Sequence, residues 1–215
     1  MDSREKVLLP TSYFPPISYM AIVTMFHEIL IEQMETYPKQ TNRNRCEIMT
    51  SSGKLNLIVP VTKPFGNHTL TKDIEICYRE PWQQHHRKSI QTAYRSAPYF
   101  NYYWDIILPL FHQKERSLVV LNEKILELLI KIIGLSTSRQ FTRDFIKKQD
   151  DVLDLRQTFK PGKENSDQRL PDYPQVFSHK HGFTGDLSIL DLIFNLGPES
   201  KGYLASSYKP QASSS

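Results

Sequence analysis

The chain has 215 residues, 39% of them apolar and 23% charged, with a formal net charge of +4 and an isoelectric point near 8.9. These values predict one folded domain and exclude a disordered chain. The basic excess is small, so it suits an anionic small-molecule substrate and falls short of the dense basic stripe of a nucleic-acid binder. We therefore expect a small anionic partner and no nucleic acid.

The cysteines and the apolar stretches indicate a cytoplasmic protein. Cys46 and Cys77 stand in no CxxC pair and show no zinc spacing with histidines, so no metal site is predicted. A disulfide scaffold is not expected at this length, which favours a reducing compartment. The N-terminus lacks the apolar stretch of a signal peptide, and no apolar run approaches the roughly 20 residues that span a bilayer. The sequence thus predicts no membrane insertion.

The start of the chain has the pattern of a strand, a helix and a second strand. Val7–Leu9 is an apolar run that ends at Pro10 and predicts a buried strand. Ile17–His27 carries its large apolar side chains on one helical stripe, and Pro16 suits the turn that opens it. Ile29–Gln33 predicts a second strand. A strand, helix and strand within about 30 residues indicate a βαβ unit with a parallel pair.

The middle and the end of the chain combine a hairpin with further strands and helices. Cys46–Met49 and Leu55–Val61 flank Ser51-Ser52-Gly53, a hairpin signal in which the glycine supplies a positive φ. The remaining predicted elements are strands at Ile74–Tyr78 and Tyr173–Phe177 and helices at Pro81–Ser96, Tyr99–Phe111, Leu118–Ile133 and Leu187–Phe194. Asn122 either interrupts or caps the third of these helices.

Together these elements predict an α/β fold: a mixed β-sheet with flanking helices, a βαβ start plus a β-hairpin, and a helical C-terminal half. We expect residues 1–208 to form a single domain. Residues 209–215, which end in three serines, are expected to be a disordered tail. The sequence contains no internal repeat.

The loop after the first strand is the first candidate binding segment. Ligands of open α/β sheets bind beyond the carboxyl ends of strands, and a helix N-terminus suits a phosphate or carboxylate. Thr11 and Ser12 can donate hydrogen bonds there, and Tyr13 can stack on a ligand. The alternative is that Thr11 or Ser12 caps the helix region while the prolines stiffen the turn.

A polar run before the hairpin is the second candidate. Residues 39–45 contain three cations and two asparagines and no apolar side chain. Arginine presents a planar donor fork that matches phosphates and carboxylates. Arg43 and Arg45 share one side if the strand alternates, with Asn44 between them. The alternative is a solvated loop.

The third candidate lies on the helix that begins near Pro81. Trp82, His86 and Ile90 are successive i+4 neighbours, and Tyr94 continues the row. His86 therefore lies among large apolar residues, where a pKa near neutrality suits a general acid or base. The alternative is a core histidine that is hydrogen-bonded to backbone.

The segment His179–Ser188 is the fourth candidate. It predicts either a substrate loop or simple capping of the next helix by Asp186 or Ser188. Stronger signatures are absent from the sequence, including GxSxG, the P-loop, HExxH and the Rossmann glycine triplet. Residue spacing by itself therefore names no reaction, and no cofactor is expected.

Several of these segments, in this order, resemble the WbqC-like family, and its Bacteroidetes-type members in particular. The matching stretches are Leu8–Tyr19, Glu35–Cys46, Leu57–Val61, Trp82–His86, Ala93-Tyr94, Ala97–Phe100, Leu187–Leu192 and Gly197-Pro198. Many relatives carry a His-Gln-Pro-Asn-Tyr pattern where this chain has Leu9 to Tyr13. No role for that His or Gln carries over to this chain.

The resemblance implies a transferase of surface-polysaccharide (O-antigen or capsule) biosynthesis that moves a small acyl or aminoacyl group, such as glycyl, to a nucleotide-linked sugar. It implies substrate-binding roles for Arg43, Asn44, Arg45 and Tyr94 and a general-base role for His86, which fall on its motif positions. The alternative is a non-catalytic sugar-nucleotide-binding or accessory module of a glycan-assembly complex. Both hypotheses require that these segments surround a common cavity.

Overall fold

The computed structural model describes residues 6–146, 152–159 and 170–207. The tail predicted to be disordered, residues 209–215, lies outside the described residues. The single domain predicted for residues 1–208 stays a prediction. The α/β fold class is confirmed, with a parallel sheet, antiparallel hairpins and a helical C-terminal region.

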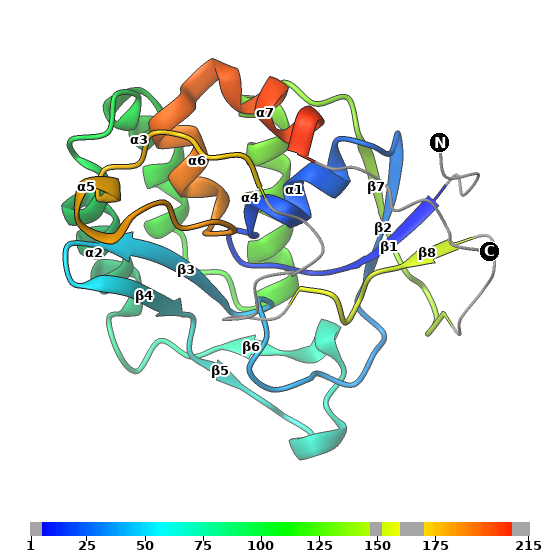
Figure 1. Ribbon diagram of the computed structural model, residues 1–215. Helices are drawn as coiled ribbons and strands as arrows, with labels where there is room; N and C mark the ends of the chain where they lie inside the picture. The colour runs from blue at the N-terminus through cyan, green and yellow to red at the C-terminus, as the bar shows by residue number, and fades with distance from the viewer. Residues whose placement is uncertain (1–5, 147–151, 160–169, 208–215) are drawn as a thin grey trace.

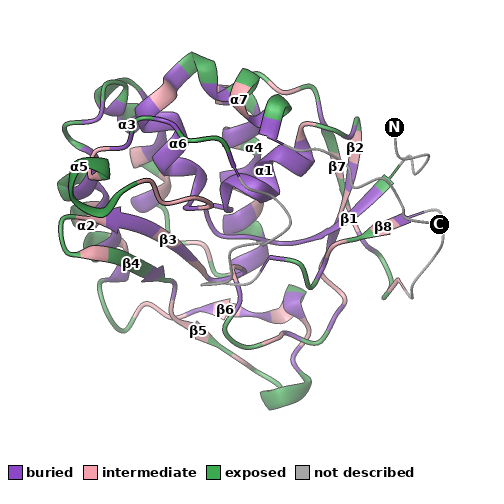
Figure 2. Cartoon of the chain, viewed as in Figure 1, coloured by how far each residue is buried: buried purple, intermediate pink, exposed green. Residues whose placement is uncertain are grey.

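The βαβ unit at the start of the chain forms as predicted. β1 (Lys6–Pro10) and β2 (Glu28–Glu32) pair in parallel, from Val7 opposite Ile29 to Pro10 opposite Glu32. The helix between them, α1 (Ile17–Val23), is buried at every residue, as its uniform colour in Figure 2 shows. It ends four residues before the predicted His27, because the Thr24 hydroxyl donates to the Ala21 carbonyl at 2.7 Å and the chain turns there.

Two further strands extend this pair into a parallel sheet. β7 (Ser138–Phe141) pairs with β2, and β8 (Val152–Asp154) pairs with β1, so the order is β7-β2-β1-β8. All described pairs in this sheet are parallel, so the four strands end on the same side. We call this side, marked by Pro10, Glu32, Phe141 and Asp154, the carboxyl edge.

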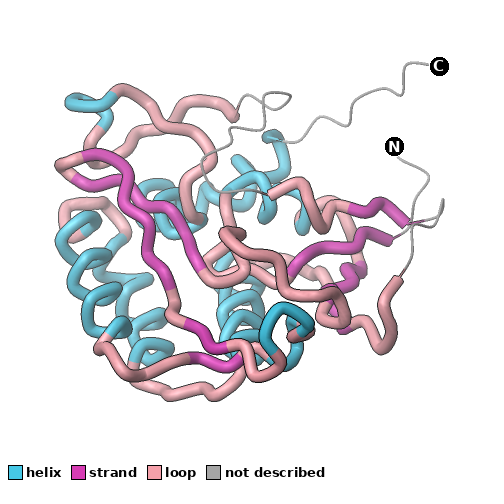
Figure 3. Tube along the Cα trace, turned by 90° about the horizontal axis from the view of Figure 1, so that it is seen from below, coloured by secondary structure: helices cyan, strands magenta, loops and turns pink. Residues whose placement is uncertain are grey.

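The antiparallel pairs lie in separate two-stranded sheets. β3 (Arg45–Thr50) and β4 (Gly53–Ile58) form the predicted hairpin, and Gly53 has the positive φ, 109°, that its turn requires. β5 (Val61–Thr62) pairs with β6 (Glu75–Ile76), which is shorter than the predicted strand at Ile74–Tyr78. Seen from below, the β3–β4 hairpin runs between the helices and the parallel sheet (Figure 3).

Several of the remaining helices lie on the side of the molecule away from the parallel sheet, while the helix Leu118–Ile133 lies beside α1 and is tied to β7 by ion pairs of Arg139 with Glu123 and Glu127 (Figure 1). The α-helices are α2 (Trp82–Tyr94), α3 (Phe100–Ile107), α4 (Leu118–Ile133), α5 (Ser178–His181), α6 (Ile189–Leu196) and α7 (Ser200–Ser207). Short 3₁₀ turns lie at Gly66–His68, Thr71–Asp73, Leu108–Phe111 and Gly197–Glu199.

Two predictions about these elements were wrong. Tyr173–Phe177 is no strand, because the Tyr173 and Gln175 side chains turn to a common acceptor, the buried Asp191 carboxylate, at 2.5 and 2.8 Å. Asn122 neither interrupts nor caps a helix. It lies inside α4, whose bounds are those predicted. Gly134, with φ 74°, is the C-cap residue that follows the helix.

Candidate functional site

A buried carboxylate at the end of β2 organises the carboxyl edge. Glu32 is fully buried, and its first oxygen accepts from the Thr142 hydroxyl at 2.8 Å and from the Met34 N–H at 2.7 Å. Its second oxygen accepts from the Arg156 guanidinium at 2.9 Å. Arg156 also pairs with Asp154 at 2.6 Å. The ends of β2 and β8 are thereby held together by charge.

Arg43 is connected to this network and has a structural role in it. Its side chain is 2% exposed, with Nε 2.8 Å and Nη2 2.5 Å from the same Glu35 oxygen. Its Nη2 also donates to the Arg156 carbonyl at 3.2 Å. Burial raises the pKa of Glu35, and the Arg43 charge acts in the opposite direction. The donor fork predicted to bind a substrate anion is therefore occupied by a carboxylate of the protein itself.

The first two candidate loops meet each other directly. The Tyr13 N–H donates to the Asn42 carbonyl at 2.9 Å, and the Ser12 hydroxyl donates to the same carbonyl at 3.3 Å. From α4, the Asn122 amide donates to the Thr11 hydroxyl at 3.1 Å and to the Arg43 carbonyl at 2.8 Å. The structure thus brings the first two candidate segments into contact with each other and with α4.

A small cavity lies between the loop after β1, β2 and α4. Its volume is about 10 Å³, which accommodates about one water molecule, and its walls include Thr11, Ser12, Asn122 and Glu123. Asn122 Oδ1 and Glu123 Oε2 are buried and have no hydrogen-bond partner among the described residues. These two acceptors suit a water molecule that donates to both of them.

Asn44 and Tyr94 also carry internal hydrogen bonds. The Asn44 amide donates to the Val59 carbonyl at 2.9 Å, and the Val59 N–H donates back to the Asn44 carbonyl at 2.8 Å. Tyr94 is fully buried, accepts from the Met49 N–H at 3.4 Å and hydrogen-bonds to Asp191. Tyr94 therefore belongs with Tyr173 and Gln175 to the group of side chains that hydrogen-bond to Asp191 of α6, and not to the network of Arg43.

His86 contacts the loop after β1 through Tyr13. The Tyr13 hydroxyl lies 2.9 Å from His86 Nδ1, and the backbone of Ile58 also hydrogen-bonds to the ring. His86 is 4% exposed, and burial lowers its pKa to about 4, so the ring is neutral near pH 7. The Trp82 ring packs against it edge to face, with 5.1 Å between centroids.

The N-terminus of α1, predicted as a place for a ligand anion, holds a carboxylate from the fourth candidate segment. Asp186 accepts from the Ser18 N–H at 2.8 Å and from the Ser18 hydroxyl at 2.9 Å. Burial raises the pKa of Asp186 to about 6. Ser188 caps α6 through the Leu190 N–H at 3.4 Å, so the capping alternative is confirmed for Ser188.

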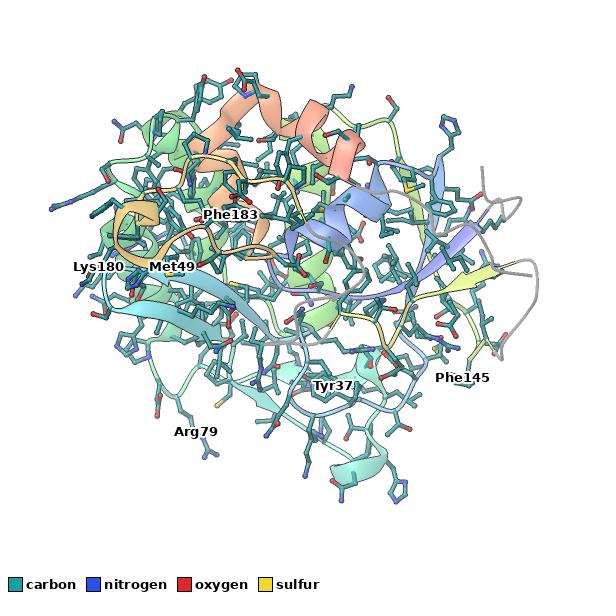
Figure 4. The ribbon with its side chains drawn as sticks, viewed as in Figure 1. Tyr37, Met49, Arg79, Phe145, Lys180 and Phe183 are labelled. Atoms are coloured by element: carbon teal, nitrogen blue, oxygen red, sulfur yellow. The ribbon has the colours of Figure 1, made fainter. Side chains whose placement is uncertain are left out.

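Arg45 differs from Arg43 in that its Nε has no acceptor among the described residues. Its Nε is buried and has no hydrogen-bond partner in the described part of the chain, and the same holds for the Tyr37 hydroxyl. The two side chains are electrostatic neighbours, and the Lys63 ammonium lies 5.0 Å from the Tyr37 ring centroid. Figure 4 shows Tyr37 on the connection from β2 to β3. We call Tyr37, Arg45 and Lys63 the donor cluster.

Tyr37 and Lys63 are absent from the residues that the sequence singles out. Tyr37 falls within a stretch that matches the family, but nothing in its spacing distinguishes it from a core tyrosine. Burial raises its pKa to about 12, while the charges of Arg43 and Arg45 act in the opposite direction. The phenol thus remains a hydrogen-bond donor near pH 7.

The comparisons with known proteins define the class. The chain is an α/β protein whose first strand–helix–strand unit leads into the candidate site, and residues 11–163 match the WbqC-like protein family. Because this match covers more than half of the chain, the protein belongs to the WbqC-like protein family. It is also 24% identical to the uncharacterized protein Rv1507c of Mycobacterium tuberculosis, over 94% of this chain and 97% of that protein. No solved structure matches the chain.

Within residues 6–146, 152–159 and 170–207, the His, Cys, Asp and Glu side chains form no group of three suited to a metal ion. None of the helices in these ranges is long and apolar enough to cross a membrane.

Loss of the Arg43 charge is predicted to destabilise the protein strongly. Arg43→Met leaves Glu35 buried without its partner, which typically costs about 3–5 kcal/mol of unfolding free energy. Urea unfolding at pH 7 measures this loss, and adding Glu35→Gln should recover part of it. Arg116→Met is the control, because its side chain is 85% exposed and such surface pairs contribute about 0–1 kcal/mol. Equal effects of the two arginine substitutions would contradict the structural role of Arg43.

His86 is predicted to make stability depend on pH. Its pKa is 6.5 in the unfolded chain and about 4 in the fold, so stability present above pH 6.5 is lost as the pH falls towards 4. We expect this group to remove about 3 kcal/mol of unfolding free energy between pH 7 and pH 4. His86→Gln keeps a donor and an acceptor but does not titrate. Its urea unfolding should therefore change less over this range, and identical pH profiles would refute the assignment.

Proposed function

We propose that the protein is a transferase of surface-polysaccharide biosynthesis that moves a small acyl or aminoacyl group to a nucleotide-linked sugar. Family membership supports the general class. The donor cluster supports an anionic substrate. The observation that carries the proposal is the pair of buried donors, Arg45 Nε and the Tyr37 hydroxyl, that lack an acceptor among the described residues.

The charges around the donor cluster favour an anion. Arg43 and Glu35 form an ion pair at 2.5 Å and so neutralise each other, whereas Arg45 and Lys63, near Tyr37, form no ion pair with an acidic residue in the described part of the chain. A buried donor without a partner typically costs about 1–3 kcal/mol. A phosphate or carboxylate oxygen can accept from both donors, and the arginine fork matches its geometry.

The chemistry of the proposed transfer needs a proton acceptor. The attacking amine or hydroxyl of the sugar forms a bond to the acyl carbon, the bond to the leaving group breaks, and the proton of the attacking group passes to a base. His86 is the proposed base, since its ring is neutral near pH 7. Tyr13, which occupies Nδ1 at 2.9 Å, must then release this nitrogen during the reaction.

A second candidate function is a binding module without catalysis. It is favoured by the contacts of His86, whose ring is 4% exposed and hydrogen-bonded to both Tyr13 and Ile58. Under this interpretation His86 is a core residue that fixes the loop after β1, and the donor cluster holds a sugar nucleotide for another enzyme.

Arg45 provides the test of anion binding. Calorimetry against UDP- and dTDP-amino sugars should show binding to the wild type. Arg45→Gln should bind about 10- to 100-fold more weakly, because a hydrogen bond to a charged group contributes about 1.5–3 kcal/mol. Arg116→Gln, which removes a charge from a side chain that is 85% exposed, should bind as the wild type does. A flat response of the wild type across the panel, or equal affinities of the two variants, would overturn the proposal.

Turnover in a His86 variant separates the two functions. If the protein is a transferase with His86 as base, His86→Gln should keep ligand affinity within about threefold and lose at least 100-fold in rate, as general-base loss typically costs 10²–10⁴-fold. Product formation is followed by mass spectrometry of the sugar nucleotide. Absence of turnover in the wild type, with ligand binding intact, would instead establish the binding module.

A further inference from the structure

A larger cleft opens at the start of α2. Its volume is about 380 Å³, and it lies between residues 78–84, which lead into this helix, and residues 111–114, which follow the 3₁₀ turn at Leu108–Phe111. This volume lies within the range of small-ligand sites, and it is many times that of the cavity at the carboxyl edge. Four of its lining residues, Trp82, Gln83, Gln84 and Arg87, belong to the helix of the third candidate segment, and the others belong to no candidate segment.

The two walls of the cleft are tied to each other. The Tyr78 hydroxyl donates to the Glu115 carbonyl at 2.8 Å, and the Gln83 amide donates to the Gln113 carbonyl at 2.6 Å. Both bonds cross from one wall segment to the other. The cleft is therefore a fixed feature of the fold and does not depend on a single exposed loop.

The cleft is electropositive. Arg79, Arg87 and Lys114 line it, against the single carboxylate of Glu80. Within the described ranges these three cations form no ion pair, and Lys114 lies over the Tyr78 ring at 5.7 Å. Figure 4 shows Arg79 extending outwards from the connection between β6 and α2.

Two further groups in the cleft wall favour an anion. α2 has 13 residues, begins in this wall and carries no acidic side chain in its first turn, so its N-terminal partial charge is not compensated there. Trp82 lines the cleft and is 4% exposed, and its indole N–H has no acceptor among the described residues. A buried indole N–H usually has a hydrogen-bond partner, so this donor suits an oxygen atom of a ligand bound in the cleft.

We propose that this cleft binds a small phosphorylated ligand, a phosphomonoester or a diphosphate, with its phosphate between Arg79, Arg87 and Lys114. Three cations around one concavity match the charge of a dianion better than that of a single carboxylate, which one arginine fork satisfies. The volume suits a metabolite and is too small for a groove that follows a nucleic-acid strand. The proposal does not rest on the donor cluster, with which the cleft shares no lining residue.

The first test uses inorganic pyrophosphate and calorimetry at fixed ionic strength. The wild type should bind the probe, and Arg87→Gln should bind it at least about tenfold more weakly, in keeping with the loss of one charge-assisted hydrogen bond. Lys88→Gln is the matched control, because it removes the same charge from the next residue of α2, whose exposed side chain does not line the cleft. Lys88→Gln should bind within about twofold of the wild type.

Trp82 provides a second readout that locates the ligand. Pyrophosphate should change the tryptophan fluorescence of the wild type and of Trp104→Phe but not that of Trp82→Phe, which keeps an aromatic ring in the wall. No binding at millimolar pyrophosphate, equal losses in Arg87→Gln and Lys88→Gln, or an unchanged Trp82 signal would each overturn the proposal. So would tighter, steeply salt-dependent binding of a single-stranded oligonucleotide, since this would identify a nucleic-acid surface. Arg45→Gln should bind pyrophosphate in the cleft as the wild type does, which keeps this test separate from that of the proposed function.

Discussion

The buried ion pair between Arg43 and Glu35 is the contact on which the carboxyl edge depends. A guanidinium that is 2% exposed has lost its hydration, so its bonds to Glu35 and to the Arg156 carbonyl must offset a desolvation cost of several kcal/mol. These bonds hold the connection from β2 to β3 against the turn after β8. The same connection presents the Asn42 carbonyl to the Tyr13 N–H. The loops that match the family are therefore held by this pair of charges together with the bonds that the Asn122 amide donates to Thr11 and to the Arg43 carbonyl.

Elements with a clear local period could be predicted from the sequence, and elements fixed by distant contacts could not. α4, Leu118–Ile133, has the predicted bounds because its apolar stripe and its terminal glycine are local features. β8 has three residues, too few for a period, and its pairing with β1 spans most of the chain. Residues 173–177 form no strand, because Asp191, the acceptor that turns the side chains of Tyr173 and Gln175 inwards, lies on another element.

The candidate site shows the same division. Arg43 and Arg45 belong to the polar run that contacts the loop after β1, yet the two arginines look alike in the sequence pattern. Only the fold decides that Glu35 pairs with Arg43, while Arg45 Nε has no acceptor within the described ranges. Burial and pairing are tertiary properties, so the residue types of a binding site can be predicted more readily than their availability. The cleft at α2 is harder still to predict, because its walls join residues about 30 positions apart in the sequence.

The loop after β1 lies between the carboxyl edge and the cleft at α2, so it contacts both candidate sites. On one side it contacts the carboxyl edge through Asn42. On the other side, Phe14 stacks on Phe111, which lines the cleft, with 5.8 Å between the ring centroids. The backbone of Phe14 is strained, with a φ of 37°. Trp82, in the same cleft wall, packs on His86, which in turn holds the Tyr13 hydroxyl. A ligand that moves the Trp82 ring therefore acts on His86 by direct contact, so any coupling between the sites needs only one row of packed rings.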